Sequence, residues 1–235
     1  MNPSPVAVRA PGLARAAKAR RVSAMLRLGL MLVLVLGLVR WTHGFEVWTF
    51  EGRRQAQVQA GELRARPVPL RASDGSVLRL WGDAEVAPAA YLVDFVYTRC
   101  PSVCRALGSE YQRMQRELDR RQGSEPTLRD VHLVSISFDV EHDDPARLAR
   151  YAIEMRADPQ HWTLAVPATH DDALGLLRSL AVVVVPDGEG GFVHNGAIHL
   201  LDERGHLRGL FGSEQWPQAL EAAHRLAAAR RGGAS

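Results

Sequence analysis

The sequence predicts an α/β sandwich with a mixed β-sheet, preceded by one N-terminal membrane anchor helix. Three observations support this fold class. Apolar runs rich in β-branched residues alternate with amphipathic helical segments from residue 91 onward, as expected for parallel strands joined by helices. Turn-bounded strand pairs over residues 68–81 and 197–211 indicate antiparallel hairpins at both ends. An uncharged apolar stretch between arginines lies near the N-terminus.

The N-terminal segment combines a basic tail with a short apolar run. The first 27 residues carry six basic side chains and no acid, and Leu28–Val39 lies between Arg27 and Arg40. Twelve residues fall short of the roughly 20 that a full span needs, but Trp41 and snorkelling arginines extend the apolar zone. We expect an uncleaved single-pass signal-anchor, with its N-terminus in the cytoplasm by the positive-inside rule. A cleaved signal peptide and a buried core helix are the alternatives.

This topology sets the expected domains and location. Residues 1–23 form a cytoplasmic basic tail, 24–42 the transmembrane anchor, 43–65 a polar spacer, and 66–235 the folded domain. The protein is expected in the inner (cytoplasmic) membrane with the C-terminal domain on the periplasmic or extracytoplasmic side. Beyond the first 27 residues the chain has 23 basic against 26 acidic residues, so the domain lacks the charge excess that nucleic-acid binding favours.

The first half of the domain is predicted to run from a hairpin into two strand–helix units. Val68–Ala72 and Val77–Trp81 flank a turn at Asp74-Gly75. The expected strands and helices that follow are Tyr91–Tyr97 (strand), Cys104–Arg121 (helix), Val131–Phe138 (strand) and Pro145–Met155 (helix), with a loop at Gly123–Arg129. The helix after the cysteines carries an apolar stripe at three- and four-residue spacing, at Leu107, Tyr111, Met114 and Leu118.

The second half is predicted to add a strand–helix unit, a hairpin and a final helix. The expected segments are Trp162–Val166 (strand), Asp171–Leu180 (helix), Ala181–Val185 (strand), Asp187–Gly191 (loop), Ala197–Leu201 and His206–Phe211 (hairpin) and Ser213–Arg230 (helix capped by Ser213). This order matches a thioredoxin-like sandwich, in which the first central strand delivers a cysteine motif to the N-terminus of the next helix.

Cys100 and Cys104 are the only cysteines in the chain. Residues four apart in a helix, or in a turn entering one, lie on the same face, so both sulfurs are able to reach one point. A helix N-terminus favours the thiolate form, and thiolates suit Cu(I), Zn(II) and thiol–disulfide chemistry. The sequence favours a metal over a redox pair or a structural disulfide, and all three interpretations stay open at this point.

A third ligand to a two-thiolate site is expected to be one of nine histidines. His194 follows a Gly-rich loop and lies at the predicted mouth of a strand, where α/β sites collect. His199 is five residues on, and alternation along a strand puts it on the opposite face, in a packing role. The other histidines are expected to be surface, turn or structural residues: His43, His132, His142, His161, His170, His206 and His224.

Three stretches carry a resemblance to the Sco/SenC family of thioredoxin-like copper proteins of cytochrome c oxidase assembly. DFVYTRCPSVC (94–104) resembles the family's strand followed by Cys-Pro-x-x-Cys. LVSISFDVEHDDP (133–145) resembles its acidic segment, and HNGAIHLLDERG (194–205) resembles its His-containing segment. The resemblance extends over roughly residues 68–226. Arg105, Val193 and Gly196 depart from the residues common at these positions.

The resemblance implies a copper ion held by Cys100, Cys104 and His194, with Asp139 in a supporting role. It implies a metallochaperone, rather than an enzyme, that delivers copper to the copper-containing subunit of a membrane cytochrome c oxidase. The alternative is a thiol–disulfide oxidoreductase that keeps the cysteines of the oxidase copper site reduced. A copper or redox sensor with no delivery role is a third hypothesis.

Overall fold

The computed structural model describes residues 25–37, 50–82, 88–100, 103–188 and 190–233. Two compact units are present, Met1–Arg53 and Arg54–Ser235. In the first unit, residues 25–37 are helical. None of the helices in the described ranges is long and apolar enough to cross a membrane. The predicted anchor extends at both ends past this helix, into residues outside the described ranges.

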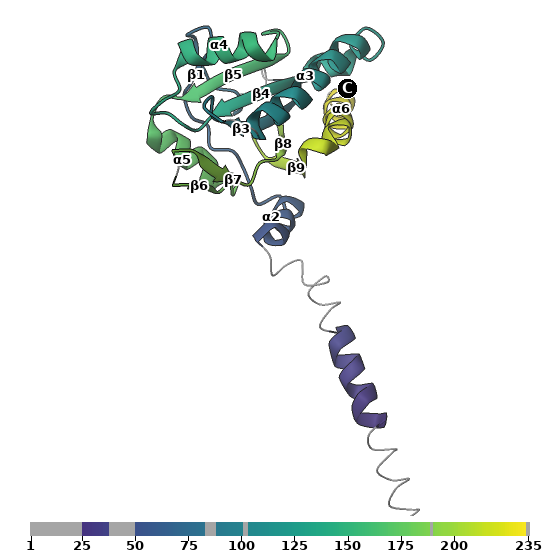
Figure 1. The fold of residues 1–235 in the computed structure, drawn as a ribbon. Helices are drawn as coiled ribbons and strands as arrows, with labels where there is room; N and C mark the ends of the chain where they lie inside the picture. The colour runs from purple at the N-terminus through teal and green to yellow at the C-terminus, as the bar shows by residue number, and fades with distance from the viewer. Residues whose placement is uncertain (1–24, 38–49, 83–87, 101–102, 189, 234–235) are drawn as a thin grey trace, which may run out of the picture. The chain divides into compact units, whose positions relative to one another are not determined.

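A seven-stranded mixed sheet forms the centre of the second unit (Figure 1). Its strand order is β2-β1-β5-β4-β3-β8-β9, with β3, β4 and β5 parallel and the remaining pairs antiparallel. A separate two-stranded ribbon pairs β6 with β7. The strands are β1 (Leu70–Ala72), β2 (Val77–Leu78), β3 (Ala90–Val96), β4 (Val131–Ser137), β5 (Trp162–Pro167), β6 (Val184–Pro186), β7 (Phe192–His194), β8 (Ile198–Asp202) and β9 (Leu207–Phe211).

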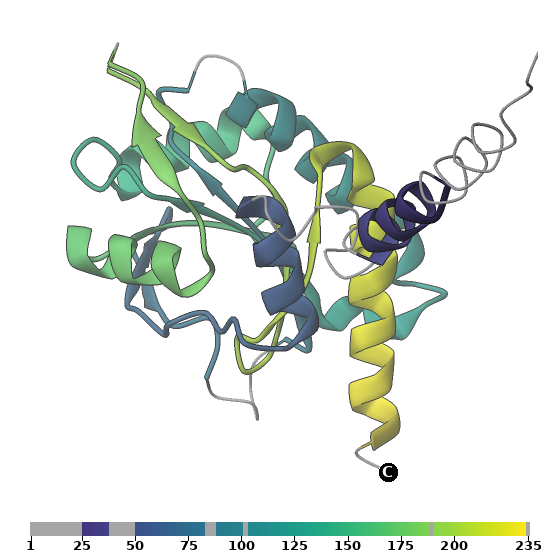
Figure 2. The ribbon, with the colours of Figure 1, turned by 90° about the horizontal axis from the view of Figure 1, so that it is seen from below.

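Helices cover both faces of this sheet (Figures 1 and 2). They are α2 (Phe50–Gln59), α3 (Val103–Arg121), α4 (Pro145–Met155), α5 (His170–Ser179) and α6 (Trp216–Gly233), with 3₁₀ turns at Pro126–Asp130 and Ser213–Gln215. One buried cluster joins α3, α4 and α6 to the sheet, and a second joins α2 and α5 to the opposite face. This is the thioredoxin-like sandwich that the sequence predicts.

The apolar stripe of α3 is the clearest link between sequence spacing and packing. Leu107, Tyr111, Met114 and Leu118 are all buried against the sheet, and the last three have no exposed surface. Burying one such side chain contributes about 1.5–3 kcal/mol. The stripe therefore fixes the rotation of α3 and places its first turn, which contains Cys104, at the end of β3.

The region around His194 differs from the sequence prediction. The predicted strand Ala181–Val185 begins only at Val184, and it pairs antiparallel with β7. His194 therefore ends a separate hairpin strand and does not lie at the mouth of β8. Because β7 and β8 are different strands, the alternation argument that separated His194 from His199 does not apply.

Two smaller differences occur at the ends of the domain. Gly212 precedes a 3₁₀ turn over Ser213–Gln215, so α6 begins at Trp216 and Ser213 is not its cap. The C-terminal half of α2 packs into the core: Arg54 is 1% exposed and Val58 is buried. The buried core of the domain thus includes residues before residue 66, the predicted start of the domain. The four predicted domain boundaries stay a prediction.

Candidate metal centre

Cys100 lies just beyond the central strand. β3 is buried along its whole length between β4 and β8, and the backbone N–H of Cys100 donates to the carbonyl of Tyr97 at 3.1 Å. This short turn redirects the chain into α3. Cys100 is half-buried and packs against the cluster on the α5 face of the sheet. Cys104 lies in the first turn of α3, and its side chain is outside the described part of the structure.

An aromatic group carries His194 to the same end of the sheet. Phe138 follows β4, and its ring centroid is 5.4 Å from that of Tyr97 and 5.4 Å from that of His194. Phe192 closes the group, at 5.3 Å from both Tyr97 and Phe138. Tyr97 and Phe138 belong to the buried cluster against which Cys100 packs. Two of the predicted ligands, 94 residues apart in the sequence, therefore border the same buried cluster: Cys100 packs against it, and His194 contacts its Phe138 ring.

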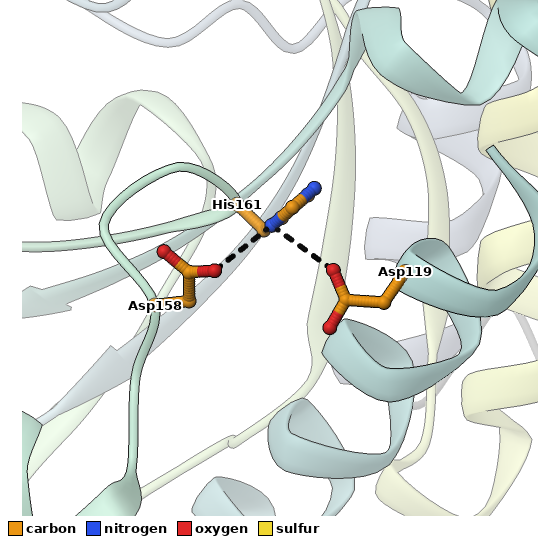
Figure 3. A group of neighbouring side chains, drawn as sticks. All are labelled: Asp119, Asp158 and His161. Carbon is orange, nitrogen blue, oxygen red and sulfur yellow. Dashed lines mark ion pairs between the residues drawn. The ribbon is translucent and has the colours of Figure 1, made fainter. Parts of the chain in front are cut away.

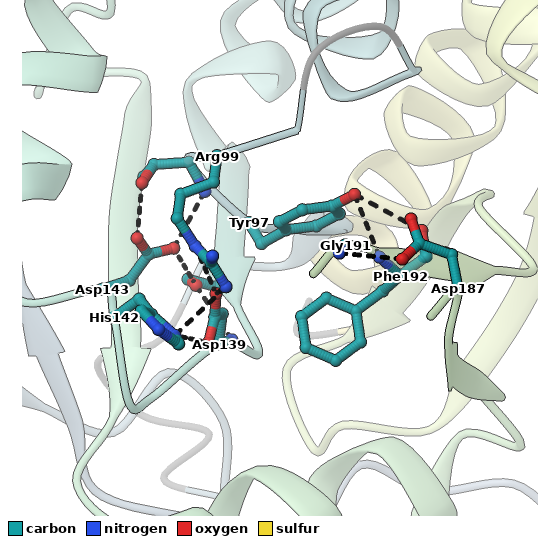
Figure 4. Close-up of polar contacts among 10 residues, drawn as sticks. Tyr97, Arg99, Asp139, His142, Asp143, Asp187, Gly191 and Phe192 are labelled. Carbon is teal, nitrogen blue, oxygen red and sulfur yellow. Dashed lines mark hydrogen bonds and ion pairs between the residues drawn. The ribbon is translucent and has the colours of Figure 1, made fainter. Parts of the chain in front are cut away.

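The backbone of β7 is also tied directly to Tyr97 (Figure 4). The N–H of Phe192 donates to the Tyr97 hydroxyl at 3.2 Å, and the N–H of Gly191 donates to Asp187 Oδ1 at 2.9 Å within the hairpin turn. The first bond holds the hairpin against the end of β3, and the second closes the hairpin turn. The position of His194 thus depends on the strand that precedes Cys100.

His194 has the state expected of a neutral metal ligand. Both ring nitrogens are buried, and neither has a hydrogen-bond partner among the described residues. Burial lowers the pKa of His194 below its ordinary value, which favours the neutral imidazole that metals bind. Leaving a buried polar atom unpaired costs about 1–3 kcal/mol, and a coordinated ion removes that cost for one nitrogen. The residues present therefore fit a soft metal ion.

Gly196 leaves room for this imidazole. A Cβ at Gly196 would lie 3.2 Å from His194 Cε1, closer than ordinary van der Waals contact. Glycine has no side chain, and the imidazole of His194 lies next to the space that a Cβ would fill. Gly196 thus permits the orientation of His194 that the structure shows.

Asp139 supports the cysteine turn through Arg99 (Figure 4). Asp139 is 5% exposed and follows β4. Its Oδ2 accepts from Arg99 Nη2 at 2.8 Å, and its Oδ1 lies 2.8 Å from His142 Nδ1. Arg99 immediately precedes Cys100, so the contact is to the residue beside the ligand. This geometry supports the predicted role of Asp139 as a group that holds the loop.

Asp143 holds Thr98, in the same turn as Arg99, and the sequence interpretation missed this role of Asp143. It is 1% exposed. Its Oδ2 accepts from the Thr98 N–H at 2.9 Å, its Oδ1 accepts from the Thr98 hydroxyl at 2.5 Å, and Ser137 Oγ donates to it at 2.5 Å. The sequence signal that could have identified Asp143 was the acidic segment after β4. Because β3 and β4 are adjacent and parallel, the residues that follow them meet at the same edge of the sheet.

His199 has the packing role that the sequence predicts. It is buried, and its Nδ1 donates to the carbonyl of Val93 at 3.1 Å. A carbonyl only accepts, so Nε2 is the acceptor for Arg54 Nη2 at 2.5 Å. Burial, followed by the nearby Arg54 charge, lowers the pKa of His199 to about 3. Both ring nitrogens are engaged, which leaves no lone pair for a metal.

Comparisons with known proteins agree with this fold. The family model described as SCO1/SenC matches residues 79–229. A SCO1 protein homolog of Bacillus subtilis (strain 168) is 25% identical over 130 residues, which are 54% of this chain and 64% of that protein. The matched region thus spans less than two thirds of the relative's length.

Solved structures show the same fold. A SCO1/SenC family lipoprotein of Bacillus anthracis str. Ames superposes with a TM-score of 0.60 at 19% identity, over 70% of this chain and 95% of that one. ScoI of Bradyrhizobium japonicum, with copper bound, gives 0.56 at 24% identity, over 69% and 99%. BsSco, described as having a disulfide switch and as a member of the Sco family of cytochrome c oxidase assembly proteins, gives 0.56 at 18% identity, over 71% and 94%.

Proposed function

The chain belongs to the SCO1/SenC family, and from that premise we propose that it is a membrane-anchored copper chaperone. In this proposal Cys100, Cys104 and His194 hold one copper ion, and the domain delivers it to the copper centre of a cytochrome c oxidase subunit. The observation that carries the proposal is His194, a half-buried residue whose two ring nitrogens are buried and have no hydrogen-bond partner among the described residues. Its ring contacts Phe138, which belongs to the cluster against which Cys100 packs. A simple dithiol reductase does not need such a group.

Copper is the cargo here, and the donor set suits its transfer. Thiolate and imidazole are the soft and borderline ligands that Cu(I) accepts at low coordination number. Each cysteine loses its proton to solvent when it binds the ion. An incoming thiolate of the client is able to join before one of the chain's own ligands leaves. Asp139 and Asp143 hold the turn, so the sulfur of Cys100 is positioned while the exchange occurs.

The membrane anchor belongs to the same proposal. The described helix over residues 25–37 exposes its apolar side chains: Met25, Leu26, Leu28, Leu30, Met31, Leu32, Val33, Leu34, Val35 and Leu36 are 46–73% exposed. An unpartnered apolar surface of this kind suits lipid. The basic tail before it predicts a cytoplasmic N-terminus and an extracytoplasmic domain. A C-terminal alkaline phosphatase fusion would be active in this topology, and an inactive fusion would refute it.

Copper stoichiometry under reducing conditions tests the ligand set. The parent chain is expected to bind one copper ion, and Cys104→Ala and His194→Ala are each expected to weaken binding by about 10-fold or more. His206→Ala is the matched control, because His206 contacts Asp202 at 3.2 Å on the far hairpin. Parent-like affinity in both ligand variants would show that the three-ligand site is wrong.

A second candidate function is a thiol–disulfide oxidoreductase. It is favoured by the strand–turn–helix placement of the cysteine pair and by the likeness to BsSco, described as containing a disulfide switch. In this reaction the two thiols form a disulfide, and a client disulfide takes up two electrons and two protons. Cys104→Ser is then expected to trap a covalent mixed disulfide, while His194→Ala keeps full reductase activity.

A further inference from the structure

Three side chains able to ligate a metal, Asp119, Asp158 and His161, lie close together (Figure 3). They lie at the opposite end of the sheet from the cysteine turn. His161 directly precedes β5, and Asp158 lies three residues earlier, at the N-terminal ends of the parallel strands. Asp119 lies in the last turns of α3, which runs away from Cys100. Their ligand atoms all lie within 4.8 Å of one another. The proposed copper chemistry makes no use of this cluster.

The tautomer of His161 directs a lone pair at the two carboxylates. Its Nε2 lies 3.2 Å from Gln122 Oε1. An amide oxygen only accepts, so Nε2 carries the hydrogen and the neutral ring has its lone pair on Nδ1. Nδ1 is buried and has no hydrogen-bond partner among the described residues. A buried lone pair that faces two carboxylates forms a donor set that suits a cation between the three groups.

The separations suit a metal better than a proton. His161 Nδ1 lies 3.4 Å from Asp119 Oδ1 and 3.5 Å from Asp158 Oδ2. A charge-assisted N–H···O bond is shorter, at about 2.7–2.9 Å. Tetrahedral ligands about 2.1 Å from an ion lie roughly 3.4 Å apart. We propose that Asp119, Asp158 and His161 form a second metal site, for a divalent first-row transition ion such as Zn²⁺.

The loop that presents Asp158 is held in place without a metal. The Asp158 N–H donates to Gln115 Oε1 at 2.7 Å, which ties the loop to α3. Asp158 Oδ1 accepts from the Gln160 N–H at 2.9 Å, so Oδ2 is the oxygen that faces His161. Gln115, Asp119 and Gln122 recur at four- and three-residue spacing on one face of α3 and its continuation. The three ligand-bearing residues are thus supported by their neighbours.

The donor atoms define the class of ion. One imidazole nitrogen and two carboxylate oxygens suit Zn²⁺, Co²⁺ or Cu²⁺ and lack the thiolates that Cu(I) prefers. The side chains of Asp119 and Asp158 are 46% and 41% exposed, so water is able to complete the coordination. An open site of this kind exchanges its ion with solvent. It is separate from the cysteine site in both position and chemistry.

Metal titration of the full chain tests the proposal. The chain is prepared in mild detergent with Cys100→Ser, Cys104→Ser and His194→Ala, which silences the proposed copper site. Calorimetry with Zn²⁺, and absorption spectroscopy with Co²⁺, are expected to report one ion per chain. ¹⁵N NMR is expected to show a change at His161 Nδ1 while the Nε2 hydrogen persists. Because the copper ligands are already removed, failure here is distinguishable from failure of the proposed function.

Single variants in the same background locate the ion. Asp119→Asn removes an exposed ligand and leaves the fold intact, and it is expected to weaken Zn²⁺ binding by about 10-fold or more. His161→Asn is expected to reduce binding at least as strongly. His206→Asn is the matched control, since His206 has one carboxylate neighbour, Asp202 at 3.2 Å. Absence of binding, or parent-like affinity in Asp119→Asn and His161→Asn, would identify the cluster as an imidazolium–carboxylate ion pair only.

Discussion

Asp94 is expected to make the domain less stable as the pH rises through the weakly acidic range. It lies in the middle of β3 and has no exposed surface. Burial raises its pKa from 3.8 to about 7. The folded state therefore keeps this proton over a range in which the unfolded chain has lost it.

The sign and size of the effect follow from proton linkage. Between the two pKa values the folded state binds more protons than the unfolded state, so the free energy of unfolding falls as the pH rises. The slope approaches about 1.4 kcal/mol per pH unit, and the loss from pH 4.5 to pH 7.5 is about 3 kcal/mol. Above pH 7.5 the contribution levels off, because both states are then ionised.

Asp94→Asn removes this titration and keeps the side-chain shape. Urea unfolding followed by circular dichroism is measured for parent and variant from pH 4.5 to 7.5, with both cysteines replaced by serine. The difference between the two curves isolates Asp94, since every other titrating group is shared. The variant is expected to gain about 3 kcal/mol relative to the parent over this range. A difference constant to within about 0.5 kcal/mol would refute the reasoning, and the exposed Asp171→Asn should follow the parent.

Three further predictions concern the core, the cysteine turn and a hairpin. Burial lowers the pKa of His199 to about 3, so the free energy of unfolding of the domain is expected to fall as the pH drops below 6.5, by up to about 1.4 kcal/mol per pH unit. In acid unfolding, His199→Gln is expected to lack this part of the pH dependence. Asp143→Ala is expected to cost about 1–3 kcal/mol and to weaken copper binding by about 10-fold, whereas Glu141→Gln, at an exposed neighbouring position, changes neither. Gly205→Ala is expected to destabilise more than Gly75→Ala in thermal unfolding: both have positive φ, but a Cβ at Gly205 would lie 2.9 Å from a Trp81 ring carbon, while Gly75 faces open space. Equal losses at the two glycines would contradict that steric argument.

Local patterns were sufficient for most of the fold. Helix α4 (Pro145–Met155) has the predicted bounds, and the strand before the cysteines differs by one residue at each end. These segments depend on hydrophobic spacing and on Pro at a helix start, which are local properties. The ribbon that carries His194 was missed because β7 has three residues and is half-exposed. A strand of three residues is too short to show an alternation of apolar and polar side chains, and it is defined only by its pairing with β6.

The supporting residues of the site were harder to predict than its ligands. Asp139 was identified through a family resemblance, but its partner Arg99 and the role of Asp143 depend on how two strand ends meet. In the sequence, Thr98 and Asp143 are 45 residues apart. Nothing local to either residue specifies that contact.

By itself, the sequence determined the layered α/β fold, the family, and the cysteine pair at the start of a helix, because these depend on spacing along the chain. Only the tertiary structure decided that His194 belongs to a separate hairpin, which is hydrogen-bonded to Tyr97. It also decided that Asp139 and Asp143 hydrogen-bond to the turn before Cys100. It also brought Asp119 to Asp158 and His161 at the far end of the sheet. Such contacts exist only once the hydrophobic core has fixed the strand register and the rotation of α3.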